Sequence, residues 1–235
     1  MKHTYVGKEL DLFAAAARWK SYVRDQVAPY VGRDVLEVGA GQGGTTRFLI
    51  KPEADRWVCL EPDPSLADAL LHSIEAGELP RHCAVRVGTQ VDLDASETFD
   101  TLLYIDVLEH IEHDRAEVVR AAARLRPGGH LVVLCPAHQW LFTPFDESIG
   151  HFRRYTKQMF REIAPPGLDS VRLAYLDAIG LLASLGNKLV LRRSMPNPGQ
   201  IAVWDKIMIP LSRLVDPILG HTVGKSVLGI WRKPF

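Results

Sequence analysis

A chain of 235 residues that is 47% hydrophobic and 24% charged has the size and composition of one globular domain with a sizeable core. Lys and Arg together number 28, as do Asp and Glu, so the net charge is zero. This balance excludes a net positive electrostatic field that would attract nucleic acid. The first residues lack the basic-then-apolar pattern of a secretion signal, and the apolar runs are shorter than a membrane span. We therefore expect a cytoplasmic protein with one domain over 1–235.

The first two expected elements lead into a glycine-rich turn. From Leu10 to Val31, apolar residues recur at mostly helical spacing, which predicts an amphipathic helix within an N-terminal segment 1–33. The stretch from Asp34 to Thr46, DVLEVGAGQGGTT, then predicts a buried strand, a nucleotide-binding turn and the start of a helix. Its glycines also fit the dinucleotide fingerprint, so the turn alone does not separate the two cofactor classes.

Strands and helices alternate after this turn. The expected strands begin at Asp34, Arg56, Cys83, Phe99 and His130, with helices over about 45–50, 64–76 and 114–126. The letters RPGG are expected to end the third of these helices before the strand from His130. This alternation predicts a doubly wound α/β core over 34–178, whose ligands bind beyond the carboxyl ends of the strands.

The rest of the chain is less regular. Residues 136–155 form a long connection rich in His, aromatic and acidic residues, and a long loop at this edge is usually functional. Thr156 is the expected N-cap of a helix, followed by a strand from Val171 and a last strand over 222–235. Between these strands, 179–221 is expected to be a helical insertion, divided by Pro196 and Pro198 and kinked or restarted at Pro210.

Four features over about 35–134 together resemble a class I S-adenosylmethionine-dependent methyltransferase. They are Glu37 before the first glycine, Glu61 at the end of the second strand, and the runs FDTLLYIDVLEHI and LRPGGHLVV. The resemblance implies S-adenosyl-L-methionine as cofactor and S-adenosyl-L-homocysteine as product. The expected fold is a Rossmann-like seven-stranded sheet, mostly parallel with an antiparallel last strand.

The resemblance also implies a set of cofactor-binding residues. Glu61 stands 22 residues after Gly39, the usual offset of an acid that accepts ribose hydroxyls. Where many relatives carry an acid for adenine, Gly88 is followed by Thr89 and Gln90, so we expect adenine to meet these side chains or the backbone, with Asp92 as a substitute if the loop is shifted. The implied residues are Glu37, Gly39, Ala40, Gly41, Gly43, Glu61, Pro62, Thr89, Gln90, Asp106 and Val107. Glu61 as a solvated strand-end acid and Asp106 as a helix N-cap are the structural alternatives.

Methyl transfer requires alignment and removal of a proton, so we looked for a general base at the strand ends. The candidates are Asp106, Glu109, His110, His138, Asp146 and His151. Of these, His138, His151 and Asp106 are the predicted catalytic residues, since histidine is a versatile proton acceptor near neutral pH. Arg153, Arg154 and Tyr155 either bind an acidic acceptor or close the loop through salt bridges.

No metal site is predicted. Cys59, Cys83 and Cys135 stand singly in apolar strand-like runs, which favours buried free thiols. His138, Asp146 and His151 lack the spacing of a known ligand set.

The predicted function is S-adenosylmethionine-dependent methylation of a small-molecule acceptor, most simply O-methylation. The alternatives are an NAD(P)-dependent oxidoreductase using the same turn and a non-catalytic cofactor-binding or membrane-docking protein. The insertion fits a structural cap that mediates a homodimer, a lid over an apolar or lipid-linked acceptor, or a peripheral membrane contact. In the last case, the residues near headgroups are Lys188, Arg192, Arg193, Lys206 and Arg213.

Overall fold

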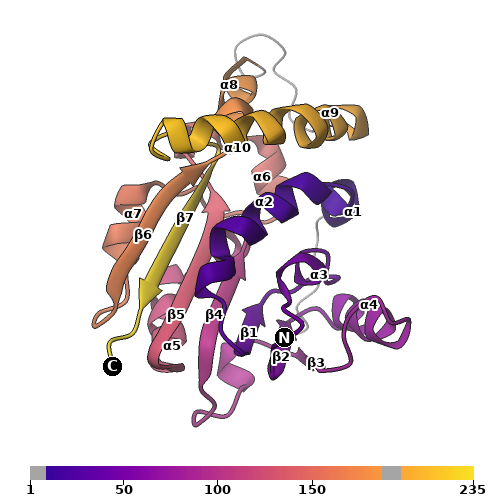
Figure 1. The fold of residues 1–235 in the computed structure, drawn as a ribbon, viewed down its shortest axis with the longest axis vertical. Coiled ribbons are helices and arrows are strands. Elements are labelled where there is room, and N and C mark those ends of the chain that lie inside the picture. The colour runs from indigo at the N-terminus through magenta and orange to yellow at the C-terminus, as the bar shows by residue number, and fades with distance from the viewer. Residues whose placement is uncertain (1–8, 187–196) are drawn as a thin grey trace.

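The computed structural model describes residues 9–186 and 197–235, which form a seven-stranded sheet in the order β3-β2-β1-β4-β5-β7-β6 (Figure 1). The strands are β1 Asp34–Val38, β2 Arg56–Glu61, β3 Cys83–Val87, β4 Phe99–Ile105, β5 Leu125–Pro136, β6 Asp169–Leu176 and β7 Ser226–Arg232. Strands β1 to β5 pair in parallel, whereas β7 pairs antiparallel with both β5 and β6. The predicted mostly parallel sheet with an antiparallel last strand is confirmed.

The place of β7 distinguishes this sheet from a dinucleotide-binding one. In the dinucleotide fold the strand order is 3-2-1-4-5-6, with the strands mostly parallel. Here the seventh strand lies between β5 and β6 and runs the other way. Its first residues therefore reach the same edge of the sheet as the last residues of β1, β4 and β5, so both contribute side chains to that edge.

Short helices connect the strands. They are α3 Thr46–Leu49, α4 Pro64–Glu75, η2 Gln90–Asp92, η3 Leu108–His110, α5 Asp114–Ala123, η4 Gln139–Leu141, α6 Pro144–Ser148 and α7 Lys157–Ile163. Thr156 caps α7 as predicted, because its side chain accepts a hydrogen bond from the Met159 amide. The core lies on both faces of the sheet: Val35 belongs to one apolar cluster and Leu36 to the other, as the alternation of a strand requires. All three cysteines are buried and free, which confirms their predicted state.

The predicted single N-terminal helix is wrong, because the chain bends at Ala15 and Ala16. It forms α1 Glu9–Ala14, α2 Ala17–Val27 and the short η1 Ala28–Tyr30. The carboxylate of Asp205, far along the chain, accepts hydrogen bonds from the amides of Arg18 and Trp19. This carboxylate satisfies amides that a new helix N-terminus would leave without partners, so a tertiary contact stabilises the break.

The prediction that RPGG precedes the fifth strand is also wrong, because the strand already begins at Leu125. Leu125 pairs with Phe99, and the register shifts before His130 pairs with Thr101. Gly129 permits this irregular pairing, since a Cβ there would lie 2.8 Å from the carbonyl oxygen of Asp100. The glycines therefore lie within the strand and permit its irregular pairing, and they do not mark its start.

The insertion lies across the carboxyl ends of the parallel strands (Figure 1). It contains α8 Ala178–Gly186, and then α9 Pro198–Val203, the π-helical η6 Trp204–Met208 and α10 Ile209–Ile218, which together make one continuous helix over 198–218. Pro210 stands in the first turn of α10, directly after the π-helical turns, and the helix continues through it, so no separate helix restarts there. The predicted divider Pro196 and the basic residues Lys188, Arg192 and Arg193 lie outside the described residues.

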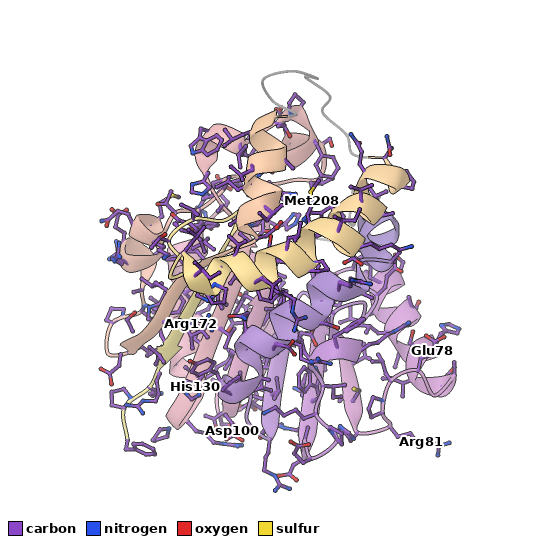
Figure 2. All side chains as sticks on the ribbon, turned by 45° about the horizontal axis from the view of Figure 1, so that its top comes forward. Glu78, Arg81, Asp100, His130, Arg172 and Met208 are labelled. Carbon is purple, nitrogen blue, oxygen red and sulfur yellow. The ribbon has the colours of Figure 1, made fainter. Side chains whose placement is uncertain are left out.

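Figure 2 shows Met208 on this helix, at the opposite end of the sheet from Asp100 and His130. The helix is tied to the N-terminal segment and to the sheet beneath it, because Tyr22 of α2 donates a hydrogen bond to Asp216 of α10. In turn, Arg172 of β6 donates to the carbonyl oxygen of Gln26 in α2. Within 9–186 and 197–235, no helix has the length and apolar character needed to cross a bilayer.

Candidate active site

A cavity of about 280 Å³ opens where β1, β4 and β5 end. Its floor is formed by Glu37 of β1, the glycine turn that follows, and Asp106 after β4. The connection after β5 contributes one wall, while α1, α2 and Trp204 of the insertion contribute an apolar one. This is the place at which a doubly wound sheet binds its ligand.

Glycine is needed at two positions of the turn for different structural reasons. Gly39 has a φ of 66°, and a Cβ there would lie 2.7 Å from Cγ2 of Val107. Gly41 has a φ of 57°, but the nearest atom to its Cβ position is a side-chain carbon of Leu10 at 3.8 Å. Gly39 therefore permits close packing of the turn on the loop after β4, whereas Gly41 keeps the turn open towards the cavity.

Glu37 is a buried carboxyl in the cavity wall, with only 3% of its surface exposed. The indole N–H of Trp57 donates to its Oε2 at 2.8 Å. Burial raises the pKa of Glu37 to about 7. A cation bound in the cavity would favour its ionised form, so this residue suits the ammonium group of an amino-acid ligand.

Glu61 lies beneath the turn rather than in the cavity wall. It is buried, and its two oxygens accept hydrogen bonds from the amides of Gly41 at 2.8 Å and Asp63 at 2.9 Å. Burial raises its pKa. Each carboxylate oxygen can accept a second bond, so ribose recognition by Glu61 stays a prediction, as does a contact from the half-buried Pro62.

The residues predicted for adenine are held by other partners. Thr89 and Asp92 form a capping box at the start of η2, in which the Thr89 amide and hydroxyl both donate to Asp92. The side chain of Gln90 points into the core, where its amide nitrogen donates to Tyr104 and Glu117. These bonds involve the amide nitrogen of Gln90, whereas its buried Oε1 has no hydrogen-bond partner among the described residues. The adenine contact expected from Thr89, Gln90 or the backbone stays a prediction.

Asp106 reaches the cavity from a strained position at the end of β4. Its φ is 55°, and its amide donates to the carbonyl oxygen of Leu134 at 2.8 Å. The side chain is open to the cavity, yet the surrounding loops enclose it, and this burial raises its pKa to about 6 against the opposing charges of His151 and Lys225. The next residue, Val107, packs against Gly39 as described above. The backbone conformation of Asp106 is uncommon outside glycine, although aspartate adopts it more readily than most residues.

His151 and Asp146 form a hydrogen-bonded pair in the opposite wall. Nδ1 of His151 lies 3.0 Å from Oδ1 of Asp146, and Arg154 donates to both oxygens of the same carboxylate at 2.7 and 2.8 Å. Although burial acts in the other direction, the hydrogen bonds from His151 and Arg154 hold the pKa of Asp146 well below its usual range. Asp146 is therefore ionised and accepts the Nδ1 proton, which leaves Nε2 of His151 as a proton acceptor.

Glu109 and His110 lie beside this pair. Within the described part of the chain, neither carboxyl oxygen of Glu109 has a hydrogen-bond partner, although the residue is fully buried. Burial and the neighbouring Asp106 raise its pKa well above the usual range, while burial and His151 lower the pKa of His110 to about 4. One ligand atom each from Glu109, His110 and His151 lie within 4.8 Å of one another, so this group, and not the set considered from sequence, is where a metal ion could fit.

The structure does not bring His138 to the cavity. Its ring stacks near Trp140 and Tyr175, with centroids 5.3 and 4.9 Å away, and its Nε2 lies 3.0 Å from the carbonyl oxygen of Gly224. These contacts are those of a residue that packs the loop against β6 and β7. Of the three predicted catalytic residues, the cavity therefore brings together Asp106 and His151.

The basic residues of the same loop close it. Arg153 forms an ion pair with Asp114 at 2.6 Å, and the hydroxyl of Tyr155 donates to the same carboxylate at 2.8 Å. Arg154 is bound to Asp146 as described. Of the two sequence interpretations, the loop-closing one fits these contacts.

The sequence analysis missed two lysines of the cavity. Lys20 donates to the carbonyl oxygen of Ala14 at 2.9 Å, and the ammonium of Lys225 lies 5.1 Å from the ring centre of Trp204. Burial lowers the pKa of both. The signal for Lys225 was its place directly before an antiparallel last strand, which carries it to the carboxyl edge of the sheet.

The order of the strands, the antiparallel β7 and the glycine turn under the cavity define the class I methyltransferase fold. Residues 36–131 match a family described as a methyltransferase domain. This match and the fold agree with the resemblance to class I S-adenosylmethionine-dependent methyltransferases that the sequence analysis described.

Curated relatives named ubiquinone biosynthesis O-methyltransferase share part of the chain. The protein from Mesorhizobium japonicum is 30% identical over 125 residues, which are 48% of this chain and 49% of the relative. That from Paracidovorax citrulli is 36% identical over 107 residues, which are 45% of this chain and 44% of the relative. The chain thus matches these relatives over about half of their length.

Solved structures share the fold over nearly the whole chain. The N-methyltransferase NodS from Bradyrhizobium japonicum, in complex with S-adenosyl-L-homocysteine, has a TM-score of 0.60 and 16% identity, covering 98% of this chain and 93% of that one. The [4+2]-cyclase SpnF has a TM-score of 0.63 and 13% identity, covering 97% and 95%. Since a cyclase shares the fold, the reaction has to be argued from the site.

Proposed function

We propose that the protein transfers the methyl group of S-adenosyl-L-methionine to a hydroxyl oxygen of a small, largely apolar acceptor. The observation that carries this proposal is the cavity itself, with Glu37 and the glycine turn on one side and the His151–Asp146 pair on the other. The names of the relatives, which are O-methyltransferases, support oxygen as the methylated atom. Methyl transfer from a sulfonium needs no more of the protein than alignment and a proton acceptor.

The cofactor is assigned to the side of the cavity formed by β1 and the loop after β4. When bound, S-adenosyl-L-methionine supplies an electrophilic methyl group on a sulfonium and leaves as S-adenosyl-L-homocysteine. The carboxyl of Glu37 would bind the ammonium of its methionine part, and the open turn at Gly41 leaves room for close approach of the backbone. Asp106, with its carboxyl open to the cavity, would hold the cofactor from the other side.

His151 is the proposed general base. Asp146 accepts the Nδ1 proton and fixes the tautomer, so Nε2 takes the proton of the acceptor hydroxyl. Arg154 keeps Asp146 ionised, and the resulting imidazolium is stabilised by that carboxylate. A positioned base of this kind contributes roughly 10²–10⁴-fold to the rate.

The acceptor is assigned to the apolar wall of the cavity. Leu10 and Phe13 of α1 lie on it together with Phe145 of α6 and Trp204 of the insertion. Such a wall buries an aromatic or aliphatic body and leaves a hydroxyl to meet His151. Because Trp204 belongs to the insertion, we also propose that core and insertion act as one domain.

The first test is the class of cofactor. Titration calorimetry of the full chain with S-adenosyl-L-homocysteine and separately with NADH should show binding of the first alone. Binding of NADH alone would support the oxidoreductase alternative and overturn the proposal. The second test is a panel of aryl and alkyl alcohols incubated with methyl-labelled cofactor, in which label should pass to an oxygen; transfer only to amines would overturn the choice of oxygen.

A further inference from the structure

The long helix over 198–218 exposes an apolar stripe to solvent. Val203, Ile207, Leu211, Leu214 and Ile218 follow one another at intervals of three or four residues, which places them on one side of the helix. Their exposed fractions are 46%, 56%, 46%, 68% and 82%. Leu182 of the neighbouring α8, 63% exposed, is a further apolar residue on the insertion. Figure 2 shows the helix, which carries the labelled Met208, at the front of the molecule.

The buried side of the same helix is mixed, because Ile201 and Ile209 are buried together with Asp205, Ser212 and Asp216. Asp205 accepts hydrogen bonds from the first amides of α2, and Asp216 accepts from Tyr22 and from the amides of Asp177 and Ala178. Ser212, also buried, donates to Asp177. A helix of a globular protein ordinarily buries its apolar side and exposes its polar one. This helix is anchored by the buried Ile201 and Ile209 and by these hydrogen bonds, whereas its apolar stripe stays largely exposed in the described chain.

The charges at the surface of the helix have one sign. Its two carboxylates, Asp205 and Asp216, are 5% and 0% exposed, whereas Lys206 and Arg213 are exposed. Arg213 also pairs with Asp25 of α2. Asp25, itself exposed, lies on α2, so the exposed charges of the helix itself are both cations. An apolar stripe flanked by cations on the same helix is a composition that binds an anionic lipid surface.

We propose that the helix over 198–218 docks its apolar stripe on the surface of an anionic phospholipid bilayer. Two copies of the chain related by a twofold axis would face each other with the same cations, which opposes a dimer through this surface, whereas anionic headgroups complement them. Trp204 extends from the same helix into the cavity wall. Docking therefore brings the cavity next to the bilayer, and it does so whatever reaction the cavity performs.

Sedimentation with vesicles tests the proposal on the full chain. Wild type should bind vesicles of phosphatidylcholine and phosphatidylglycerol in about equal amounts, and bind less at about 0.5 M salt than at about 0.1 M. The triple variant Ile207→Gln, Leu214→Gln, Ile218→Gln should bind at least about ten-fold more weakly. The matched control Leu71→Gln, Val119→Gln removes apolar residues that are 45% and 44% exposed on other helices, and it should bind like wild type.

The charge contribution has its own pair of variants. Lys206→Gln should weaken binding to the anionic vesicles, and Arg161→Gln, which removes an exposed cation on α7, should not. Thermal unfolding of every variant reports whether it is folded. Failure of wild type to bind these vesicles, or equal binding by the triple variant, would overturn the proposal. So would a dimer in solution that the triple variant dissociates without any binding to vesicles, because the stripe would then be a contact between two copies.

Discussion

Nδ1 of His151 lies 3.0 Å from Oδ1 of Asp146, and this contact sets which ring nitrogen is free to accept a proton. The two stand five positions apart in the chain, and α6 with the turn after it brings them together. Arg154 binds both oxygens of the same carboxylate, so the pair is fixed before any ligand arrives. His151 and Asp146 both line the same cavity as the glycine turn.

The first prediction concerns this pair. His151→Ala should lower kcat at least ten-fold with an acceptor found in the alcohol panel, because the proposed acceptor of the hydroxyl proton is then missing. Affinity for S-adenosyl-L-homocysteine, measured by titration calorimetry, should stay within a factor of a few. Asp146→Asn should lower kcat in the same direction, since the amide no longer fixes the tautomer.

His138→Ala is the control for the loss of a histidine from the same loop. Its ring packs between Trp140 and Tyr175, away from the cavity, so its kcat should stay close to wild type. A ten-fold loss in His138→Ala together with mild effects in both other variants would move the base to His138. The assay is run with and without a chelator, which shows whether the group Glu109, His110 and His151 acts through a metal ion.

The second prediction concerns the glycine turn. Gly41→Val should abolish binding of S-adenosyl-L-homocysteine in titration calorimetry, because a branched side chain enters the cavity from a residue with a φ of 57°. Gly77→Val imposes comparable backbone strain at a φ of 77°, where no atom lies within 4 Å of the Cβ position. Gly77→Val should therefore lose stability and keep binding. Equal affinities in the two variants would remove the turn from the site.

A third prediction tests Glu61. Glu61→Ala should also lose binding of S-adenosyl-L-homocysteine, since the ribose would lack its carboxylate acceptor. The variant also removes the acceptor of the Gly41 amide, so Glu61→Gln, which keeps one acceptor oxygen, separates the two effects. If Glu61→Ala binds within a factor of a few of wild type, the residue only supports the turn and the ribose is held elsewhere.

The regular part of the fold could be predicted from the sequence because its signals are local. Val35 and Leu36 are apolar neighbours in a strand buried on both faces. Glycines directly after such a strand are typical of a nucleotide-binding turn. The break between α1 and α2 was not predictable from spacing. It depends on Asp205, which is 186 residues from Trp19 in the chain and reaches its amide only in the folded protein.

The candidate site also contains residues that local sequence signals predict and residues that they do not. Asp106 and Glu37 follow from their places at the ends of strands, and both line the cavity. His138 and His151 both belong to a loop without periodicity, and only the folded structure separates the one that packs from the one that reaches the cavity. The burial of Gln90 was not predictable from local signals, because the partners of its amide nitrogen, Tyr104 and Glu117, are 14 and 27 residues away in the chain.

The fourth prediction is a dependence of stability on pH. Burial raises the pKa of Glu37 from 4.5 to about 7, so its ionisation costs free energy in the folded state without ligand. Below pH 4.5, Glu37 leaves the free energy of unfolding at its full value. This free energy falls as the pH rises to 7; at about 1.4 kcal/mol per pKa unit, the loss amounts to about 3 kcal/mol. Glu37→Gln should match wild type near pH 4.5 and unfold at higher urea concentration near pH 8. A constant difference between the two across this range would contradict the assignment.

The last prediction separates a lid from a cap. If the insertion were a lid, amide hydrogen exchange in 197–218 would be fast without ligand and slow when S-adenosyl-L-homocysteine and an acceptor are present. The carboxylate of Asp216, fully buried with three hydrogen bonds from Tyr22, Asp177 and Ala178, instead ties α10 to the core. We therefore predict slow exchange in α10 with and without ligands, and protection on binding in α1, whose Leu10 lies over Gly41. Asp216→Ala leaves those donors without their acceptor, so it should lower the free energy of unfolding by about 3 kcal/mol and speed exchange in α10, whereas the exposed Asp169→Ala should change neither. Fast exchange in wild-type α10 that ligands slow would support the lid.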